Sequence, residues 1–403
     1  MKFEFLGLLL VSLALALVPA QAAPTTKNVL QLGVPSDLRV QGEASNENLE
    51  VFDCVLKQLD WPYSIILFPW KRGIEELKHG RVDAIIMATP SDELEVVAEM
   101  SSPFALEKWY WFYQKNSAQA SLPINAVRLG VVSSSHTEIW LEQQGLRAEV
   151  KVNSTEQLLN MLLAGRIDTF LADEELIQEQ LKKINQPDKA LHKVFSHYIS
   201  LGVYFSSEYL HKYPVFMTGF NNNLKACNTK KWQLTFEERA EIKRDAIKLQ
   251  QQFSKINEVA GWLTQANQAF KADSATGAQL DELWATQVAA GSGKLLNSIE
   301  LHPLSQWLRL WQAESKGLIS EAYVTGLKGF NVAESQPLTD FDQSDEAEYQ
   351  AVILSDEPLF INEIEYDESS QRFQVKVAWP IKDLGKKIGM VVIGINIESA
   401  LRD

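Results

Sequence analysis

The sequence predicts two similar α/β units followed by a smaller α+β domain. Two similar stretches occur, GRVDAIIMAT from Gly80 and GRIDTFLADE from Gly165. Each follows a short amphipathic helix and begins a buried strand. After Thr235 the pattern changes to long, charged helices. From about residue 296 onward, strands with alternating apolar and polar residues appear, as in a half-buried antiparallel sheet.

The first 22 residues have the pattern of a cleaved secretory signal. Lys2 precedes an uncharged run over 6–18, and an Ala-Gln-Ala sequence ending at Ala22 supplies the small residues of a cleavage site. No later window has the length and charge-free character of a spanning helix. We therefore expect cleavage near Ala22, a periplasmic or extracellular protein, and no direct membrane insertion.

The composition is that of an ordinary globular protein with room for two or three domains. Of its 403 residues, 46% are hydrophobic and 22% are charged. The formal net charge of -14 disfavours nucleic acid and anionic lipid as partners, because clustered Lys and Arg recognise those. A small molecule and a protein are the partners that we expect.

The first α/β unit is expected to bring polar side chains to one edge of its sheet. Its strands are predicted over 29–35, 63–68 and 82–89, with a helix over 48–59 and another that begins in the PWKR stretch. Ligands of open α/β sheets sit beyond the carboxyl ends of the strands. The residues expected around this mouth are Asp37, Trp70, Arg72, Thr89 and Ser91.

The second α/β unit opens with a strand over 127–132, directly followed by Ser133, Ser134 and Ser135. Serines at a strand-to-helix junction cap the helix, and the backbone N–H groups beside them suit a carboxylate or another polar ligand group. Capping alone is the alternative. The chain is expected to cross between the two units near 116–123 and to return near 197–201, which gives two hinge strands.

The order and spacing of LGVPSD, GRVDAII, SSPF, LGVVSSS and GRIDTFLAD over residues 28–228 resemble the family 3 periplasmic solute-binding proteins of the amino-acid-binding type. The resemblance implies an α/β two-lobed periplasmic binding protein fold over 24–228. Lobe 1 would span about 28–116 and 201–228, and lobe 2 about 122–198. The two lobes would close on a small ligand.

The same resemblance implies which residues hold the ligand. Asp173 stands where the family uses an acid to bind the ligand's amino group, by a charge-assisted hydrogen bond. Leu94 occupies the position where the family has the arginine that binds an α-carboxylate through two hydrogen bonds, which leucine cannot form. We therefore expect a small polar, amine-bearing ligand in preference to a simple organic acid. The missing arginine disfavours an ordinary α-amino acid, unless Arg72 takes its role.

Cys54 and Cys227 are the only cysteines, and an even count in an exported chain favours a disulfide. The helix over 48–59 has its apolar residues on one face, which leaves Cys54 on another side. The resemblance places the helix that ends at Cys227 back against the first lobe. Two buried free thiols are the alternative.

Residues 229–295 are predicted to form a helical linker. The stretch FEERAEIKRDAIKLQQQF, which begins at Phe236, is dense in charge and has apolar positions at Ile242, Ile247, Leu249 and Phe253. Each half has apolar strands of its own, so we expect the halves on either side of this linker to have separate cores.

The C-terminal part, 296–403, is predicted to contain a helix over 303–312, a half-buried strand over 371–379 and a central strand over 388–397. Its order of elements resembles the Cache, or PDC, sensor domains, which are PAS-like α+β domains with an antiparallel sheet. The resemblance implies a second ligand pocket beside Asp340, Asp342 and Asp345.

The signals of an enzyme are weak in this chain. The six histidines show no zinc-ligand spacing, and there is no Gly-x-Ser-x-Gly nucleophile elbow. We expect no metal, no cofactor and no enzymatic activity. The preferred hypothesis is a periplasmic sensory binding protein that signals to a membrane sensor kinase or cyclase. The alternative is a substrate-delivery protein that serves an ABC permease.

Overall fold

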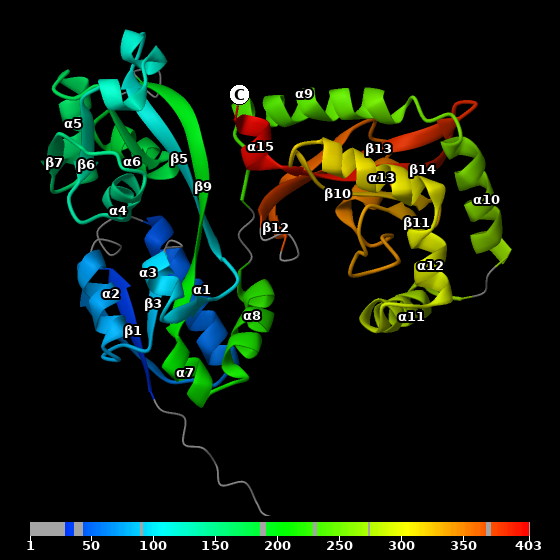
Figure 1. The fold of residues 1–403 in the computed structure, drawn as a ribbon, viewed down its shortest axis with the longest axis horizontal. Coiled ribbons are helices and arrows are strands. Elements are labelled where there is room, and N and C mark those ends of the chain that lie inside the picture. The colour runs from blue at the N-terminus through cyan, green and yellow to red at the C-terminus, as the bar shows by residue number, and fades with distance from the viewer. Residues whose placement is uncertain are drawn as a thin grey trace, which may run out of the picture.

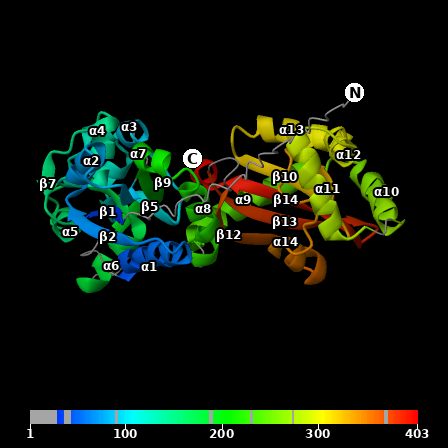
Figure 2. The same cartoon turned by 90° about the horizontal axis from the view of Figure 1, so that it is seen from below.

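The computed structural model describes residues 29–35, 43–88, 92–185, 191–228, 232–272, 275–367 and 372–402. Two bodies lie side by side, a two-lobed body built on a nine-stranded sheet and a second body built on a five-stranded sheet (Figure 1). Figure 2 shows the same arrangement from below. The predicted signal segment lies outside the described residues.

Lobe 1 is a parallel α/β layer. Its elements are β1 (Leu30–Pro35), α1 (Glu43–Gln58), β2 (Tyr63–Phe68), α2 (Trp70–Lys78), β3 (Ala84–Ala88), α3 (Asp92–Glu95) and β4 (Ala98–Met100). Strand β1 lies between β2 and β3 and is parallel to both. Leu30, Leu32 and Val34 of this central strand are all buried, because the layer is covered on both faces.

Lobe 2 repeats this arrangement. Its elements are β5 (Ala105–Gln114), β6 (Leu129–Val132), α4 (His136–Gln143), β7 (Val150–Val152), α5 (Thr155–Leu163), β8 (Thr169–Asp173) and α6 (Glu174–Lys183). Strand β6 is parallel to β7 and β8. A Cβ atom at Gly130 of β6 would lie only 2.7 Å from Ile167 Cδ1 and 2.8 Å from Leu158 Cδ1, so glycine lets these two core side chains pack directly on the strand.

The two lobes are joined by β5 and by β9 (Leu191–Ser206), which are antiparallel neighbours. Strand β9 pairs with β3 of lobe 1 from Gly202 onward, and β5 pairs with β8 of lobe 2 from Trp109 onward. The chain therefore crosses at 105–108 and 198–201. We call the paired segments 105–110 and 195–201, which contain this crossing, the hinge ribbon.

The first crossing lies earlier in the chain than 116–123, where the sequence suggests it. That prediction is wrong because the aromatic strand β5, up to Gln114, is already part of the lobe 2 sheet. The Pro- and Ser-containing stretch that follows forms only short turns, including the 3-10 helices Ala118–Ser121 and Ile124–Ala126. Turn chemistry alone does not distinguish a hinge from a surface loop.

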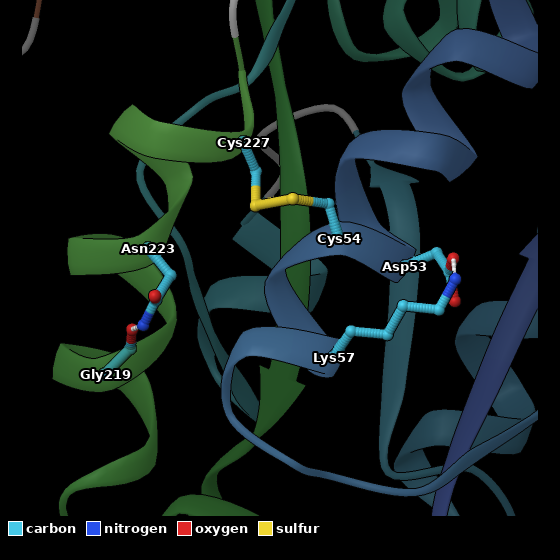
Figure 3. Close-up of a disulfide and its surroundings, with 6 residues drawn as sticks. All are labelled: Asp53, Cys54, Lys57, Gly219, Asn223 and Cys227. Atoms are coloured by element: carbon cyan, nitrogen blue, oxygen red, sulfur yellow. Dashed lines mark hydrogen bonds and ion pairs between the residues drawn. A yellow bond between two sulfur atoms is a disulfide. The ribbon is translucent and has the colours of Figure 1, made fainter.

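Helices α7 (Ser207–Lys212) and α8 (Phe216–Cys227) return the chain to lobe 1. Phe216 and Phe220 of α8 pack in one core with Phe52 and Val55 of α1. The two helices are also joined by a disulfide between Cys54 and Cys227 (Figure 3). The predicted disulfide is therefore present, and no free cysteine occurs in the described part of the chain.

The second body is an antiparallel sheet in the order β11-β10-β14-β13-β12. Its strands are β10 (Ile319–Gly326), β11 (Asn331–Glu334), β12 (Phe360–Asp367), β13 (Arg372–Asp383) and β14 (Lys386–Asn396). Its helices are α9 (Phe236–Phe253), α10 (Val259–Ala272), α11 (Gly277–Ala290), α12 (Lys294–Glu300), α13 (Pro303–Glu314), α14 (Ala347–Tyr349), the π-helical turn Gln350–Leu354, and α15 (Ile397–Leu401). Helices α9, α10, α13 and α15 pack on one face of the sheet.

Helix α9 is part of this core rather than a linker. Ile242, Leu249 and Phe253 are buried against the sheet, as their spacing suggests, whereas Ile247 is 40% exposed. The density of charge in this helix suggested a linker. A helix with one apolar stripe buries that stripe when a sheet face is available, however charged its other face is.

The two bodies also share a core, so the prediction of separate cores is wrong. Tyr198 of the hinge ribbon is buried in the cluster that contains Val375 and Ile395 of the second body. Leu106 and Phe195, on the same ribbon, pack against that cluster. The sequence hides this because these residues lie on strands that also belong to the two-lobed body.

The shared core gives a first prediction for a fragment that ends at residue 228. Such a fragment exposes Leu106, Phe195 and Tyr198, so we expect it to aggregate or to unfold at a lower temperature than the full chain. Calorimetry of the full chain is expected to show one main transition. Two separate transitions, together with a soluble, native-like fragment, would contradict the shared core.

Candidate functional site

The carboxyl ends of the strands of both lobes face each other, and the two lobes touch there. Trp70, at the start of α2 in lobe 1, lies edge-on to His136, at the start of α4 in lobe 2, with 6.4 Å between ring centroids. Ile139 of α4 packs against the lobe 1 cluster that contains Trp70. The structure therefore shows the lobes in contact around these side chains.

A half-buried carboxylate of the hinge ribbon, that of Glu107, lies beside this contact. Glu107 Oε2 accepts a hydrogen bond from Trp109 Nε1 at 2.7 Å and lies 3.1 Å from His136 Nε2. The imidazole of His136 stacks on Trp109, with centroids 5.4 Å apart. Burial raises the pKa of Glu107, but the neighbouring His136 outweighs it and holds this pKa below the ordinary value.

Asp173 supplies a second carboxylate beside the first. Its Oδ2 accepts from Leu176 N at 3.0 Å, which caps α6, and its Oδ1 accepts from Lys108 N at 2.8 Å. Burial, together with the charge of Glu107, raises the pKa of Asp173 to about 7. The two acids thus lie close enough for each to affect the ionisation of the other.

We call Trp70, Glu107, Trp109, His136 and Asp173 the interlobe site. Two further aromatic groups support it, because His197 stacks on Trp140 at 4.6 Å and meets Trp109 at 5.0 Å. Burial lowers the pKa of His197 to about 4, so this ring is neutral at pH 7. The site therefore combines two carboxylates, one paired histidine and a wall of aromatic rings.

The structure brings two of the sequence-predicted lobe residues into this site, Trp70 and Asp173. Arg72 is not part of it, because its exposed side chain pairs with Glu76 at 3.4 Å and lies over the ring of Phe68. Asp37, Thr89 and Ser91 lie outside the described residues. Leu94 is fully buried in the lobe 1 core, so a hydrophobic contact occupies the place of the missing arginine.

The three serines mainly build the turn before α4. Ser133 and Ser134 are exposed, while Ser135 is buried and caps α4 by accepting from Glu138 N. All three backbone N–H groups are bonded within the protein, to Val152 O, to Glu138 Oε2 and to Val132 O respectively. In this conformation their N–H groups already have acceptors, and a ligand role for the serines stays a prediction.

Behind this turn, on the far side of α4, lobe 2 has a cavity of about 410 Å³. Glu138 and Lys151 line it and form an ion pair at 2.5 Å. Its buried charge is therefore already paired, and we assign it no ligand.

Sequence reasoning missed Glu107, Trp109 and His136. The run of aromatic residues at 109–111 is typical of a core strand, and nothing near Glu107 in the sequence indicates that its side chain is largely covered. Strand alternation was the available signal, because it places Glu107 and Trp109 on the same face of β5. Only the pairing of β5 with β8 shows that this face lies beside Asp173.

In the second body, the three predicted ligand residues lie near the surface. Asp340 and Asp345 are exposed. Asp342 accepts from Ser344 N and lies against Gly277 at the start of α11. The three do not form a buried group.

A different set of carboxylates, some buried and some half-buried, lies on the sheet face opposite α9. It comprises Glu321, Glu334, Glu346, Glu348 and Glu365, with Lys376 as the cation among them, and we call it the acidic face. Glu348 is fully buried with one oxygen that has no partner, and the hydroxyl of the buried Tyr323 has none either. A Cβ at Gly394 would lie 2.3 Å from Gln374 Oε1 and 2.8 Å from Glu321 Cγ, so glycine makes room for these two side chains.

Burial strongly shifts the pKa values of carboxyl groups in the acidic face. It raises the pKa of Glu321 to about 7 and that of Glu334 to about 8. The surrounding glutamates raise the pKa of Lys376 despite its burial. Within the described ranges, no group of three or more His, Cys, Asp or Glu side chains is arranged to hold a metal ion.

Among the helices that the structure describes, none has both the length and the apolar character to cross a bilayer. No protein-family model and no curated protein matches the chain.

Several solved structures are similar to half of the chain. The arginine-, lysine-, histidine-binding protein ArtJ from Geobacillus stearothermophilus has a TM-score of 0.40 at 18% identity, over 49% of this chain and 89% of its own. Holo ArgBP from T. maritima has a TM-score of 0.40 at 16% identity, over 50% and 91%. A histidine kinase sensor domain with similarity to periplasmic binding proteins has 0.41 at 13%, over 49% and 89%. Likenesses of this size assign neither a family nor a ligand to this chain.

Proposed function

We propose that the two-lobed body binds a small amine-bearing cation between its lobes, and that the protein is an exported sensory binding protein that signals to a membrane partner. The observation that carries the proposal is the pair of half-buried carboxylates, Glu107 and Asp173, where the lobes meet. Buried carboxylates require a positive partner or a proton. His136 partners the first, and the raised pKa of Asp173 marks the second as lacking one.

The aromatic rings around these carboxylates support a cationic ligand. Trp70 and Trp109 present indole rings from lobe 1 and from the hinge ribbon, with the imidazole of His136 in contact with both. Indole rings attract cations through their electron-rich faces. An ammonium or guanidinium group that entered here would meet an acid and an aromatic ring together, whereas an organic acid would be repelled.

Signalling is preferred to transport because of the second body. A delivery protein does not need a second body that shares a core with its hinge. A sensor, by contrast, must transmit the presence of a bound ligand to a second surface. We propose that the second body is the Cache-type sensor part, with Asp340, Asp342 and Asp345 beside a second ligand or a docking partner. Co-purification from membranes distinguishes a sensor kinase or cyclase from an ABC permease.

The Asp173→Asn variant tests the interlobe site. We expect it to weaken binding of a cationic probe by about 2 to 3 kcal/mol, since a hydrogen bond to a charged group loses its charge. The probes are L-arginine, L-lysine and putrescine, with succinate as the anionic comparison, and calorimetry measures affinity. Affinity for the cations should rise with pH through about 7, because Asp173 must be ionised to bind them.

Asp168→Asn is the matched control for this experiment. Asp168 precedes the same strand at its other end, where it pairs with Arg128 at 2.6 Å, so its loss should leave affinity unchanged. Equal affinities of Asp173→Asn and the unmodified protein would show that Asp173 only caps α6. No binding of any cationic probe would count against the proposed ligand class.

A further inference from the structure

The hinge ribbon presents different residues to its two sides. Alternate residues of a strand point to opposite faces. Glu107, Trp109 and His197 face the interlobe site. Lys108 and Tyr198, which are directly paired across the ribbon, point instead toward the second body.

On that outer side, one carboxylate of the second body accepts hydrogen bonds from three side chains of the ribbon. Glu238 is 2% exposed and accepts from Lys108 Nζ at 2.7 Å, from Tyr198 OH at 2.8 Å and from Tyr110 OH at 2.9 Å. Although burial raises the pKa of Glu238, the charge of Lys108 and these hydrogen bonds hold it below the ordinary value. We call these four residues the Glu238 cluster.

The same carboxylate fixes the start of α9. Glu238 Oε2 also accepts from Thr235 N at 2.8 Å, and Thr235 Oγ1 accepts from Glu238 N at 3.2 Å, which together form a capping box. Lys108 Nζ donates further to Gln233 O at 2.7 Å, just before the helix. The ribbon and the first turn of α9 are therefore held by shared hydrogen bonds.

The ribbon also contacts the C-terminal elements of the second body, α15 and β13. Tyr198 N donates to Glu398 Oε1 of α15 at 3.0 Å, and the Tyr198 ring meets Phe373 of β13. On the inner side, Lys108 N donates to Asp173, which belongs to the interlobe site. Lys108 thus contacts an interlobe carboxylate through its backbone and the second body through its side chain.

We propose that the Glu238 cluster couples the opening and closing of the lobes to the second body. The lobes can rotate only by bending the hinge ribbon, and buried hydrogen bonds fix the outer side of that ribbon to α9 and α15. Opening the lobes therefore displaces or breaks the cluster. By reciprocity, loosening the cluster changes the fraction of molecules whose lobes are closed. The inference rests on the proposed function only in naming a ligand as what closes the lobes.

Hydrogen exchange of the full-length protein without ligand tests the coupling. Tyr198→Phe and Tyr110→Phe each remove one hydroxyl and keep the ring, and Glu238→Gln removes the charge. We expect amides of α2 and α4, where the lobes touch, to exchange at least about threefold faster in these variants. Conversely, His136→Ala at the interlobe site should speed exchange in the first turn of α9 by a similar factor.

Tyr113→Phe is the matched control, because Tyr113 is a buried tyrosine of the same strand β5 that lies within lobe 2, outside the Glu238 cluster. It should leave α2, α4 and α9 unchanged. The proposal is overturned if the cluster variants change exchange only in α9 and the ribbon, or if Tyr113→Phe gives the same pattern. Because no ligand is added, failure of L-arginine, L-lysine and putrescine to bind would contradict the proposed function and leave this result standing.

Discussion

Replacing Cys54 and Cys227 together by serine is expected to lower the free energy of unfolding by roughly 5 kcal/mol. The two cysteines are separated by 173 residues in the sequence, so the disulfide closes a very long loop in the unfolded chain. In the chain-entropy description, the restriction of the unfolded state grows with loop length. Urea denaturation of the oxidised protein and of the double variant measures the difference.

A control on the same helix separates this effect from damage to α1. Lys57→Ala removes an exposed ion pair with Asp53, one turn from Cys54 (Figure 3), and such pairs contribute only about 0.5 kcal/mol. The unmodified protein should also show no free thiol to maleimide in denaturant. Labelling of two thiols per chain, or equal urea midpoints for the double variant and Lys57→Ala, would refute the structural role of the disulfide.

Raising the pH from about 6.5 to about 8 is expected to destabilise the protein by roughly 3 kcal/mol. Glu334, Glu321 and Asp173 have native pKa values of about 8, 7 and 7, above those of the unfolded chain. The native state therefore binds more protons than the unfolded state in this window, and stability falls as the pH rises. The lowered pKa of His197 acts below about pH 6.5 and does not oppose this trend.

Thermal unfolding at several pH values checks this expectation. Glu334→Gln removes the largest contribution, so its melting temperature should depend less on pH and should exceed that of the unmodified protein at pH 8. Glu282→Gln, on the exposed side of α11, is the control and should leave the pH profile unchanged. If the melting temperatures of Glu334→Gln and of the unmodified protein depended on pH in the same way, the pKa of Glu334 would not be raised in the native protein.

Local patterns were enough to predict much of the two-lobed body. The repeated turn at Gly80 and Gly165 marked the two α/β units, and the carboxyl ends of their strands brought Trp70 and Asp173 to one place. The disulfide followed from the cysteine count and from the expected return of α8 to lobe 1. The two units and the place of Trp70 depend on short stretches of sequence and on general rules of α/β packing, whereas the role of Asp173 and the return of α8 to lobe 1 were implied by the resemblance to the family 3 binding proteins.

The features that sequence reasoning missed depend on contacts between distant segments. Glu107 and His136 are 29 residues apart, and Lys108 and Glu238 are 130 apart. A glutamate at the third position of α9 reads as an ordinary capping residue, since nothing near it shows that a hinge strand lies against the helix. Burial of a polar residue by a remote segment leaves no periodic signal in the sequence.

The core shared through Leu106, Phe195 and Tyr198 constrains how such a protein can be recombined. A chimera that joins this two-lobed body to another C-terminal domain at residue 228 would leave three apolar side chains and Lys108 without the surface that covers them. A successful exchange must therefore carry the outward-facing residues of the hinge ribbon along with the new domain. In evolution, the two halves are expected to be inherited as a unit, with compensating substitutions on the ribbon and at the start of α9.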